Sequence, residues 1–348
     1  MKAAFLTAAE QFEVRELAPL QAPSDGLVLE VKTCGVCGSD LRRWKEGIPA
    51  GGSPMIPGHE AAGVVKSVGT NAHSYKIGDR LAIAPDVHCG HCWYCRHGLY
   101  NLCDDLHLIG ITPGYSGGFA DEMILTGEML TNGIIHAIPA GLSFAHASLA
   151  EPCSSVLAAH TKLDTSLGDT VVVMGAGPIG CLHLVIAHSR GARVVLSEPN
   201  GIRRDMARIF NPEFIFDPSQ EDVVQKVKDQ TEGRGADIVI CANPVAVTQT
   251  QAVELVRKGG KIALFGGLPK ANPMTNLDGN RIHYGEIVVT GTFSYHPTFH
   301  EMALDVLAQG KLPADQLITN TFSLNEIQKA FENASNGKSL KVMVSLQA

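Results

Sequence analysis

The sequence predicts an α/β fold made of two domains, one rich in β-strands and one with a doubly wound parallel sheet. Two observations lead to this prediction. The chain has 348 residues, which is long for a single hydrophobic core. In roughly the first 150 residues, short β-branched runs are bounded by glycine, proline or aspartate, whereas strand-like and helix-like runs alternate after Glu151. Alternation at this spacing is typical of βαβ units and a parallel sheet.

The elements follow from these runs in order. The first part contains the strand-like runs KAAFLTA, GLVLEVKTCGV, AAGVVKSVGT and GDRLAIAP, which suggest a small barrel or sandwich. SFAHASLAEPCSSVLAAHTKL is expected to be a helix interrupted at Pro152. The strands TVVVMGAG, ARVVLSEP, ADIVICA, GKIALFGG and EIVVTGTF then alternate with helical runs such as PIGCLHLVIAHSRG and VTQTQAVELVRKG. The tail has two further helices and the strands LITNTFS and LKVMVSL, and periodicity alone does not show which domain it joins.

Composition and charge exclude several classes of protein. The formal net charge of -7 argues against a nucleic-acid-binding protein, which usually has a basic surface. No apolar run approaches the roughly 20 residues that span a bilayer, so we expect no membrane association. The first residues, MKAAFLTAAEQFEVRE, become acidic too early for a signal peptide. We therefore expect a cytoplasmic protein, in which clustered thiols indicate metal binding or catalysis more often than disulfides.

A glycine motif predicts a dinucleotide site. VVVMGAGPIG places Gly175, Gly177 and Gly180 after a strand and at the start of a helix, the context that a G-x-G-x-x-G fingerprint requires. The first glycine allows the tight turn, the second lets the backbone approach a pyrophosphate, and the third allows close helix–strand packing. Glu198 ends the next strand, where a carboxylate binds ribose hydroxyls and repels a 2′-phosphate, so NAD is favoured over NADP. The expected cofactor-binding residues are Gly175, Gly177, Pro178, Ile179, Gly180, Glu198 and Arg203, and the arginine keeps NADP open as an alternative.

Four cysteines in one loop form the strongest metal signal. Cys89, Cys92, Cys95 and Cys103 follow the pattern C-x2-C-x2-C-x7-C, and four thiolates can close a tetrahedron around Zn²⁺. An iron–sulfur cluster has similar spacing, but it would need a redox partner site that the sequence does not show. Four sulfur ligands leave no open position for a substrate, so this zinc is expected to be structural. His88 and His91 are interpreted as solvated loop residues or as hydrogen-bond donors to the ligands, because the four thiolates already complete the coordination shell.

A second, sparser set of residues offers the ligands of an open zinc site. The set consists of TCGVCGSD (33–40), PGHE (57–60) and AEPCSS (150–155). With the four-cysteine loop, the glycine motif and GTFSY (291–295), these segments resemble the zinc-dependent medium-chain dehydrogenases, and within them the sorbitol (polyol) dehydrogenase branch. The resemblance covers nearly the whole chain. It implies a GroES-like catalytic domain of residues 1–152 and 294–348, split in sequence around a Rossmann NAD-binding domain of residues 153–293.

The resemblance also implies the roles of individual residues. A catalytic zinc would be held by Cys37, His59 and Glu151, with Glu60 as a neighbouring or alternative ligand, so that each chain would hold two zinc ions. The zinc would lower the pKa of an alcohol whose carbon then gives a hydride to the nicotinamide ring. Ser39 resembles the hydroxyl residue that takes the alcohol proton, and Asp40 resembles the carboxylate that orients the zinc histidine.

One position departs from the pattern of these relatives. Many of them carry a histidine two residues after the aspartate, and Arg42 stands there in this chain. A guanidinium stays charged and does not shuttle protons as imidazole does. The hypothesis for Arg42 is contact with a cofactor phosphate.

The substrate is predicted only as a class. The resemblance places Trp44, Phe119 and Tyr295 in the substrate cleft, and we expect His296 and His300 to be surface residues at a helix start. Sorbitol-oxidising relatives often have arginine where this chain has Ser294, so a polyol or another secondary alcohol is expected rather than sorbitol in particular. A phosphorylated polyol stays open as an alternative, although no basic cluster dedicated to a phosphate stands out in the sequence. The alternatives are a threonine-type amino-alcohol dehydrogenase and a non-catalytic NAD- or zinc-binding protein. The partners expected are a small alcohol and further copies of the chain, as a tetramer or dimer.

Overall fold

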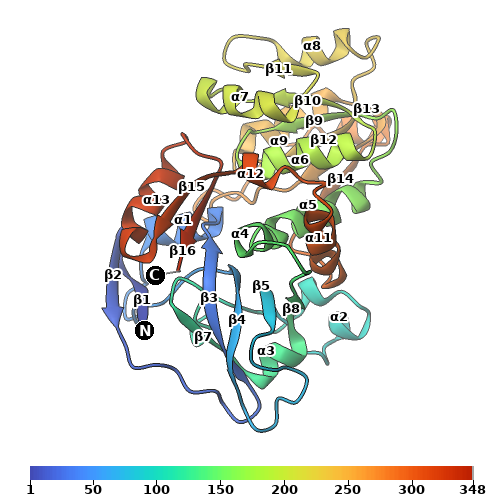
Figure 1. Ribbon diagram of the computed structural model, residues 1–348. Coiled ribbons are helices and arrows are strands. Elements are labelled where there is room, and N and C mark those ends of the chain that lie inside the picture. The colour runs from blue at the N-terminus through green and yellow to red at the C-terminus, as the bar shows by residue number, and fades with distance from the viewer. Residues whose placement is uncertain (347–348) are drawn as a thin grey trace. The chain divides into compact units, whose positions relative to one another are not determined.

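The computed structural model describes residues 1–346, which form two compact units (Figure 1). The first unit comprises Met1–Ser154 together with the C-terminal segment that begins at Ser294, and the second comprises Ser155–Phe293. The first boundary falls inside helix α5 (Ala150–Leu163). The second falls between Phe293 and Ser294, shortly after the last strand of the second unit.

The first unit is built mainly from antiparallel strands. Its strands are β1 (Lys2–Ala8), β2 (Gln11–Glu16), β3 (Leu27–Gly35), β4 (Glu60–Val68), β5 (Arg80–Val87), β6 (His107–Leu108), β7 (Glu122–Leu125), β8 (Gly133–Ala137), β15 (Ile318–Ser323) and β16 (Lys341–Ser345). The pair β1–β2 forms a small sheet, and the other strands form a sheet in the order β15-β16-β3-β4-β5-β6, with β7 on β3 and β8 on β5. The four strand-like runs predicted near the N-terminus are thus confirmed as β1, β3, β4 and β5.

Strand β3 organises this unit. Seven of its nine residues are buried, and Glu30 and Lys32 are partly exposed. The C-terminal strand β16 pairs antiparallel with it, Met343 opposite Gly35, so the tail of the chain joins the first unit (Figure 1). The core of this unit combines side chains from both segments, with Phe331 of the tail in contact with the rings of Trp44 and Phe119.

Short helices connect the strands of the first unit. They are α1 (Gly38–Glu46), α2 (Trp93–Arg96), α3 (Gly127–Asn132), α4 (Phe144–Ala147), α11 (Thr298–Ala308), α12 (Ala314–Leu317) and α13 (Ile327–Ser335), with single 3₁₀ turns at Tyr100–Leu102 and Leu324–Glu326. The prediction of a helix interrupted at Pro152 is wrong. The break lies earlier, between α4 and α5, and Pro152 sits in the first turn of α5, where a missing N–H costs no helical hydrogen bond.

The second unit contains a six-stranded parallel sheet. Its strands are β9 (Thr170–Met174), β10 (Arg193–Ser197), β11 (Phe214–Phe216), β12 (Ala236–Cys241), β13 (Val256–Leu264) and β14 (Val288–Gly291), in the order β11-β10-β9-β12-β13-β14. The helices are α6 (Pro178–Ser189), α7 (Gly201–Ala207), α8 (Val223–Asp229), α9 (Ala246–Leu255) and α10 (Gly279–Gly285), with a 3₁₀ turn at Arg208–Phe210. The predicted parallel sheet is confirmed, and the only strand missed is the three-residue β11.

Strand order in this sheet determines where a ligand can bind. The chain leaves β9 toward β10 on one side and returns through β12 on the other, so the order reverses beside β9. Ligands of open parallel sheets bind outside the carboxyl ends of the strands at such a reversal, which here is the turn after Met174. Cys181 and Cys241 are fully buried packing residues of this unit. Within residues 1–346, no helix has the length and apolar character needed to cross a membrane.

Candidate active site and metal centres

The start of helix α1 brings together three predicted site residues. Cys37 is the N-cap of α1, and Ser39 and Asp40 lie in its first turn, because the helix begins directly after β3 ends. The Oδ2 atom of Asp40 accepts a hydrogen bond of 3.0 Å from the N–H of Cys37. Asp40 is 2% exposed, so this bond holds a buried carboxylate in one position.

Strand β4 places His59 against these residues. His59 lies directly before β4, and its Nδ1 is 3.4 Å from Asp40 Oδ1, while its Nε2 is 3.3 Å from the Ser39 hydroxyl. A carboxylate beside Nδ1 favours a proton on that nitrogen, which leaves the Nε2 lone pair for a ligand. Burial alone would lower the pKa of His59, but the charges of Asp40 and Cys37 outweigh burial and hold it well above its usual value.

Cys37, His59 and Glu60 form a group whose donor atoms lie within 4.8 Å of one another. The group offers one sulfur, one nitrogen and one carboxylate oxygen, which are the donors that Zn²⁺ accepts in sites with an open position. Both carboxylate oxygens of Glu60 are buried and lack a well-aligned hydrogen bond. A buried carboxylate of this kind is stabilised by a cation, so the residues fit a zinc ion.

Lys341 is the cation that the structure itself supplies to Glu60. Its ammonium forms an ion pair with the Glu60 carboxylate and donates a hydrogen bond of 3.1 Å to the carbonyl of Val36. Lys341 is 3% exposed and Glu60 is 0% exposed. Burial alone would lower the pKa of Lys341, but the Glu60 charge raises it above its usual value. The sequence alone did not indicate Lys341, because it lies at the start of the C-terminal strand β16, far along the chain from Glu60.

Glu151, the expected third zinc ligand, is not part of this group. It lies in the first turn of α5, and its carboxyl is outside the set of donors that lie within 4.8 Å of one another. Burial, followed by the charge of Glu60, raises the pKa of Glu151 to about 8. Burial and the nearby Glu60 charge thus favour a protonated, neutral Glu151 near neutral pH, whereas Glu60 is the carboxylate that lies beside the thiol and imidazole.

The four-cysteine loop forms a separate cluster. The sulfur atoms of Cys89, Cys92, Cys95 and Cys103 lie within 4.8 Å of one another, and all four thiols are free. The backbone N–H groups of Cys89 and Cys92 donate to sulfur atoms of the cluster at 3.2 and 3.3 Å. Backbone hydrogen bonds also lower the pKa of Cys92 to about 6, whereas burial raises the pKa of Cys95 to about 12 and also raises that of Cys103. Such N–H···S contacts stabilise thiolates, so the cluster fits a zinc ion held by four sulfur atoms.

Neither neighbouring histidine belongs to the four-cysteine cluster. His91 Nδ1 hydrogen-bonds the carbonyl of Cys89 at 2.8 Å, and the His88 ring packs against Tyr100 at a tilt of 44°, with centroids 4.4 Å apart. The loop thus uses its histidines for local packing and hydrogen bonding.

The glycine motif of the second unit lines a cavity of about 710 Å³. Gly175 has φ +113°, and a Cβ on Gly180 would come within 1.9 Å of the Gly175 carbonyl oxygen, so both positions require glycine. A Cβ on Gly177 would meet nothing within 4 Å, which leaves open space at the start of α6. Pro178 and Ile179 form the first turn of that helix, whose N–H groups can bind a phosphate. The site therefore fits the pyrophosphate of a dinucleotide.

Glu198 and Arg203 also line this cavity. The two carboxylate oxygens of Glu198 accept hydrogen bonds from the backbone N–H groups of Ala176 and Asn200, at 2.7 and 2.8 Å. The Nε atom of Arg203 is buried and lacks a hydrogen-bond partner within the part of the chain that the structure describes. An unpartnered guanidinium nitrogen beside the cavity is available to a ligand.

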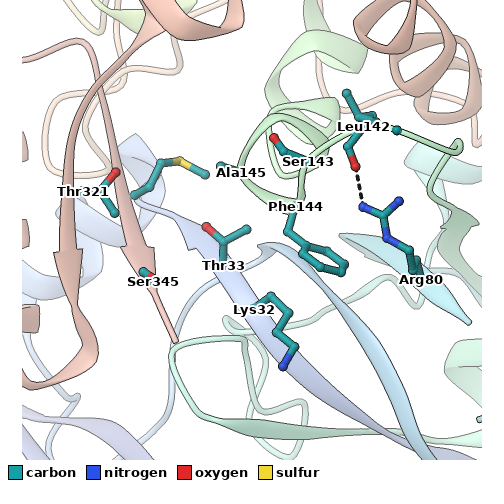
Figure 2. Close-up of a pocket in the computed structure, with 11 residues that line it drawn as sticks. Lys32, Thr33, Arg80, Leu142, Ser143, Phe144, Ala145, Thr321 and Ser345 are labelled. Atoms are coloured by element: carbon teal, nitrogen blue, oxygen red, sulfur yellow. Dashed lines mark hydrogen bonds between the residues drawn. The ribbon is translucent and has the colours of Figure 1, made fainter. Parts of the chain in front are cut away.

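A further cavity in the first unit, of about 500 Å³, contains none of the predicted site residues (Figure 2). Its two cations already have partners. Lys32 forms an ion pair of 2.6 Å with Glu30, and Arg80 donates to the Leu142 carbonyl while its guanidinium lies 4.5 Å from the centre of the Phe144 ring. This cavity therefore offers no unpaired charge to a ligand.

Several expectations about the substrate cleft need correction. Trp44 and Phe119 are 4% and 0% exposed and pack in the hydrophobic core around Phe331 rather than lining an open cleft. His300 is not a surface residue, because it is fully buried and its Nδ1 lies 2.9 Å from that of His136. Tyr295 is also buried, and its hydroxyl has no partner among residues 1–346.

Comparison with known proteins agrees with this arrangement. Residues 23–138 match the family described as alcohol dehydrogenase GroES-like domain, and residues 178–309 match the family described as zinc-binding dehydrogenase. The sorbitol dehydrogenase of Bacillus subtilis (strain 168) is 32% identical over 99% of this chain and 97% of its own length. The chain belongs to the zinc-dependent medium-chain dehydrogenase family.

Two further family members mark the range of similar proteins. The D-arabitol-phosphate dehydrogenase of Enterococcus avium is 32% identical over 96% of this chain and 94% of its own length. The solved structure of alcohol dehydrogenase TADH from Thermus sp. ATN1 covers 100% of both chains with a TM-score of 0.91 and 26% identity. The predicted fold class, a GroES-like domain combined with a Rossmann domain, is thereby confirmed.

Proposed function

We propose that this dehydrogenase oxidises a secondary hydroxyl of a polyol or related alcohol to a ketone and transfers the hydride to NAD. The observation that carries the proposal is the group of Cys37, His59 and Glu60, with the Ser39 hydroxyl 3.3 Å from the histidine, in a chain that also has a dinucleotide cavity. Relatives named sorbitol dehydrogenase and D-arabitol-phosphate dehydrogenase support a polyol as the substrate class.

Zinc, when bound, supplies a Lewis acid that lowers the pKa of an alcohol hydroxyl, and NAD, when bound, accepts the hydride. The chain's own residues then have distinct roles. Cys37 and His59 hold the metal, and Asp40 orients the imidazole through its contact with Nδ1. Ser39, whose Oγ lies beside the ligand nitrogen, would take the proton that leaves the substrate hydroxyl while it passes its own hydroxyl proton to solvent, to which it is exposed.

Two glutamates compete for the third protein ligand. The position of Glu60 beside Cys37 and His59 favours Glu60 in this conformation, and Glu151 is the alternative once a cation offsets the repulsion between the two carboxylates. Zinc content distinguishes them. Glu60→Gln should lose the metal of the mixed site if Glu60 is the resting ligand, whereas Glu151→Gln should lose it if Glu151 is.

We further propose that the four-cysteine cluster holds a second, structural zinc and that the cofactor is NAD rather than NADP. Glu198 supports the cofactor assignment, because a buried carboxylate at the edge of the cavity repels a 2′-phosphate. Arg203 favours NADP as the second candidate, since its Nε is buried without a partner in the described chain. Binding affinities for NADH and NADPH decide between them.

The proposal also covers the role of Arg42, the cellular compartment and the oligomeric state. Arg42 is exposed, and we assign it to contact with a cofactor phosphate rather than to proton transfer. NAD affinity that is unchanged in Arg42→Ala would contradict this role. Nine free cysteines support a reducing compartment such as the cytoplasm. The family likeness supports a homo-oligomer, either a dimer or a tetramer.

The decisive experiment measures NADH formation across polyols, simple secondary alcohols and threonine, with and without a zinc chelator. Turnover of polyols that the chelator abolishes supports the proposal. Turnover of threonine alone would instead establish an amino-alcohol dehydrogenase. Binding of NAD without turnover of any alcohol would indicate a non-catalytic protein.

A further inference from the structure

Asp86 is a buried carboxylate that none of the roles assigned above uses. It is the seventh residue of β5 (Arg80–Val87), it is 4% exposed, and it belongs to neither metal-type cluster. Two other buried carboxylates of the first unit have a lysine partner, because Glu60 pairs with Lys341 and Glu122 pairs with Lys66. No such ion pair is found for Asp86 within residues 1–346. A buried carboxylate without a cation is costly, which points to a function.

The hydroxyl of Ser294 is the group that holds Asp86. Its Oγ donates a hydrogen bond of 2.5 Å to Asp86 Oδ2, while no side chain or backbone group of the described residues donates to Oδ1. Ser294 has φ +47°, in the left-handed region that residues other than glycine rarely adopt. Strained residues of this kind persist where surrounding contacts fix them and are concentrated at functional sites. One carboxylate oxygen is thus fixed and the other is left for a ligand.

Asp86 lies within electrostatic reach of the candidate active site. Burial raises its pKa to about 6, and the Ser294 hydrogen bond and the charge of His59 act in the opposite direction. The charge of Asp86 in turn raises the pKa of Glu151 and of the Tyr295 hydroxyl. Tyr295 directly follows Ser294, and its buried hydroxyl is also unpartnered in the described chain. The Asp86 carboxylate, which has Ser294 as its hydrogen-bond partner, and the buried Tyr295 phenol therefore lie within electrostatic range of Glu151.

These two groups match the chemistry of a polyol. Each polyol hydroxyl can donate one hydrogen bond and accept another, so a hydroxyl near the reacting carbon can donate to Asp86. A hydrogen bond to a charged carboxylate is stronger than one between neutral groups. The same negative charge repels a phosphate or carboxylate on a substrate, because charges interact strongly where water is excluded.

We propose that Asp86, held in place by Ser294, is a specificity-determining residue that accepts a hydrogen bond from a neutral polyol and disfavours phosphorylated or acidic substrates. The inference rests on the proposed function and extends it from an alcohol to an uncharged polyhydroxylated one. Ser294 acts as a positioning residue. The sequence shows Ser294 where sorbitol-oxidising relatives often carry arginine, but it does not show the partner of Ser294, because Asp86 is far away along the chain.

The test compares neutral polyols such as sorbitol and xylitol with a polyol phosphate, in wild type, Asp86→Asn and Ser294→Arg. Asp86→Asn should raise KM for neutral polyols about 10- to 100-fold, the range for a lost hydrogen bond to a charged group, with a much smaller change in kcat. Ser294→Arg keeps Asp86 but neutralises it, so the preference should shift toward the polyol phosphate. Binding is read independently of turnover from the rise in melting temperature that each compound causes.

Glu122→Gln is the matched control, because Glu122 is a buried carboxylate of the same unit that pairs with Lys66 outside the site. If Asp86→Asn lowers the melting temperature as this control does but leaves KM and the substrate ranking unchanged, Asp86 only stabilises the fold. An unchanged ranking in Ser294→Arg would also overturn the inference, even if Asp86→Asn does not fold. Wild-type protein that oxidises no alcohol would overturn the proposed function itself, whereas polyol oxidation with a ranking independent of Asp86 would overturn only this inference.

Discussion

Replacing Lys341 by methionine should destabilise the first unit strongly. Lys341 and Glu60 are 3% and 0% exposed, and the substitution keeps the aliphatic volume while it removes the ammonium that neutralises the Glu60 carboxylate. Removing one partner of a buried ion pair costs about 3–5 kcal/mol, because the other charge stays buried without compensation. One kcal/mol lowers the melting temperature of a domain of this size by about 2–4 °C, so Lys341→Met should melt about 6–20 °C below wild type.

The assay is thermal unfolding of the full chain, with zinc content measured on the same samples so that metal loss is recognised separately. The double variant Glu60→Gln with Lys341→Met replaces both charges and should recover most of the lost stability. Lys329→Met is the control, because Lys329 forms an exposed ion pair of 3.3 Å with Glu326 and should leave melting unchanged. The reasoning is refuted if Lys341→Met melts within about 2 °C of wild type, or if the double variant is no more stable than the single one.

Three further predictions test the separate sites. Cys37→Ser should abolish turnover with little change in the melting temperature, whereas Cys95→Ser should lower the melting temperature. Equal effects of the two substitutions on activity and stability would contradict the division between a catalytic and a structural zinc. Gly180→Ala should weaken NADH binding, measured by fluorescence titration, because its Cβ would lie 1.9 Å from the Gly175 oxygen, and unchanged affinity would count against the motif. Burial holds the pKa of His183 well below its usual value, so the stability that its neutral form provides is complete above about pH 6.5 and falls by about 1.4 kcal/mol per pH unit below it. His183→Gln should flatten this pH dependence in urea unfolding, and an unchanged slope would be inconsistent with the assignment.

Features set by short-range geometry could be predicted from the sequence. The four cysteines lie in one loop of 15 residues, so their spacing alone brings the sulfur atoms together. The glycines of the nucleotide site are equally local, since a strand, a tight turn and a helix start are consecutive in the chain. Cys37, Ser39 and Asp40 also share one turn of helix, which fixes their relative positions.

Contacts between distant segments could not be predicted in the same way. Lys341 meets Glu60 only because β16 pairs with β3 and β3 with β4, and that register is a property of the whole sheet. Asp86 meets Ser294 through the same kind of long-range packing. The assignment of aromatic residues to the substrate cleft was wrong for a different reason, because aromatic side chains pack equally well in a hydrophobic core and in a substrate cleft. Trp44 and Phe119 were therefore placed in the cleft on resemblance alone, whereas the packing of Phe331 against them places both in the core.

The balance of charge separates the two metal-type clusters in chemical terms. In the four-cysteine cluster, backbone N–H groups donate to sulfur atoms and stabilise thiolates locally. Four thiolates complete the coordination shell of one zinc ion. The mixed site instead gathers four carboxyl groups from separate elements, Asp40, Glu60, Asp86 and Glu151, of which Glu151 has its pKa raised to about 8. The positive groups near them are Lys341 and His59. A buried site with more anions than cations is stabilised by a divalent metal, and it keeps a negative field around the remaining space after the metal binds. A neutral substrate can donate hydrogen bonds to the remaining negative groups, whereas an anionic substrate is repelled by them. Metal binding and a preference for uncharged polyols therefore follow from the same arrangement of residues.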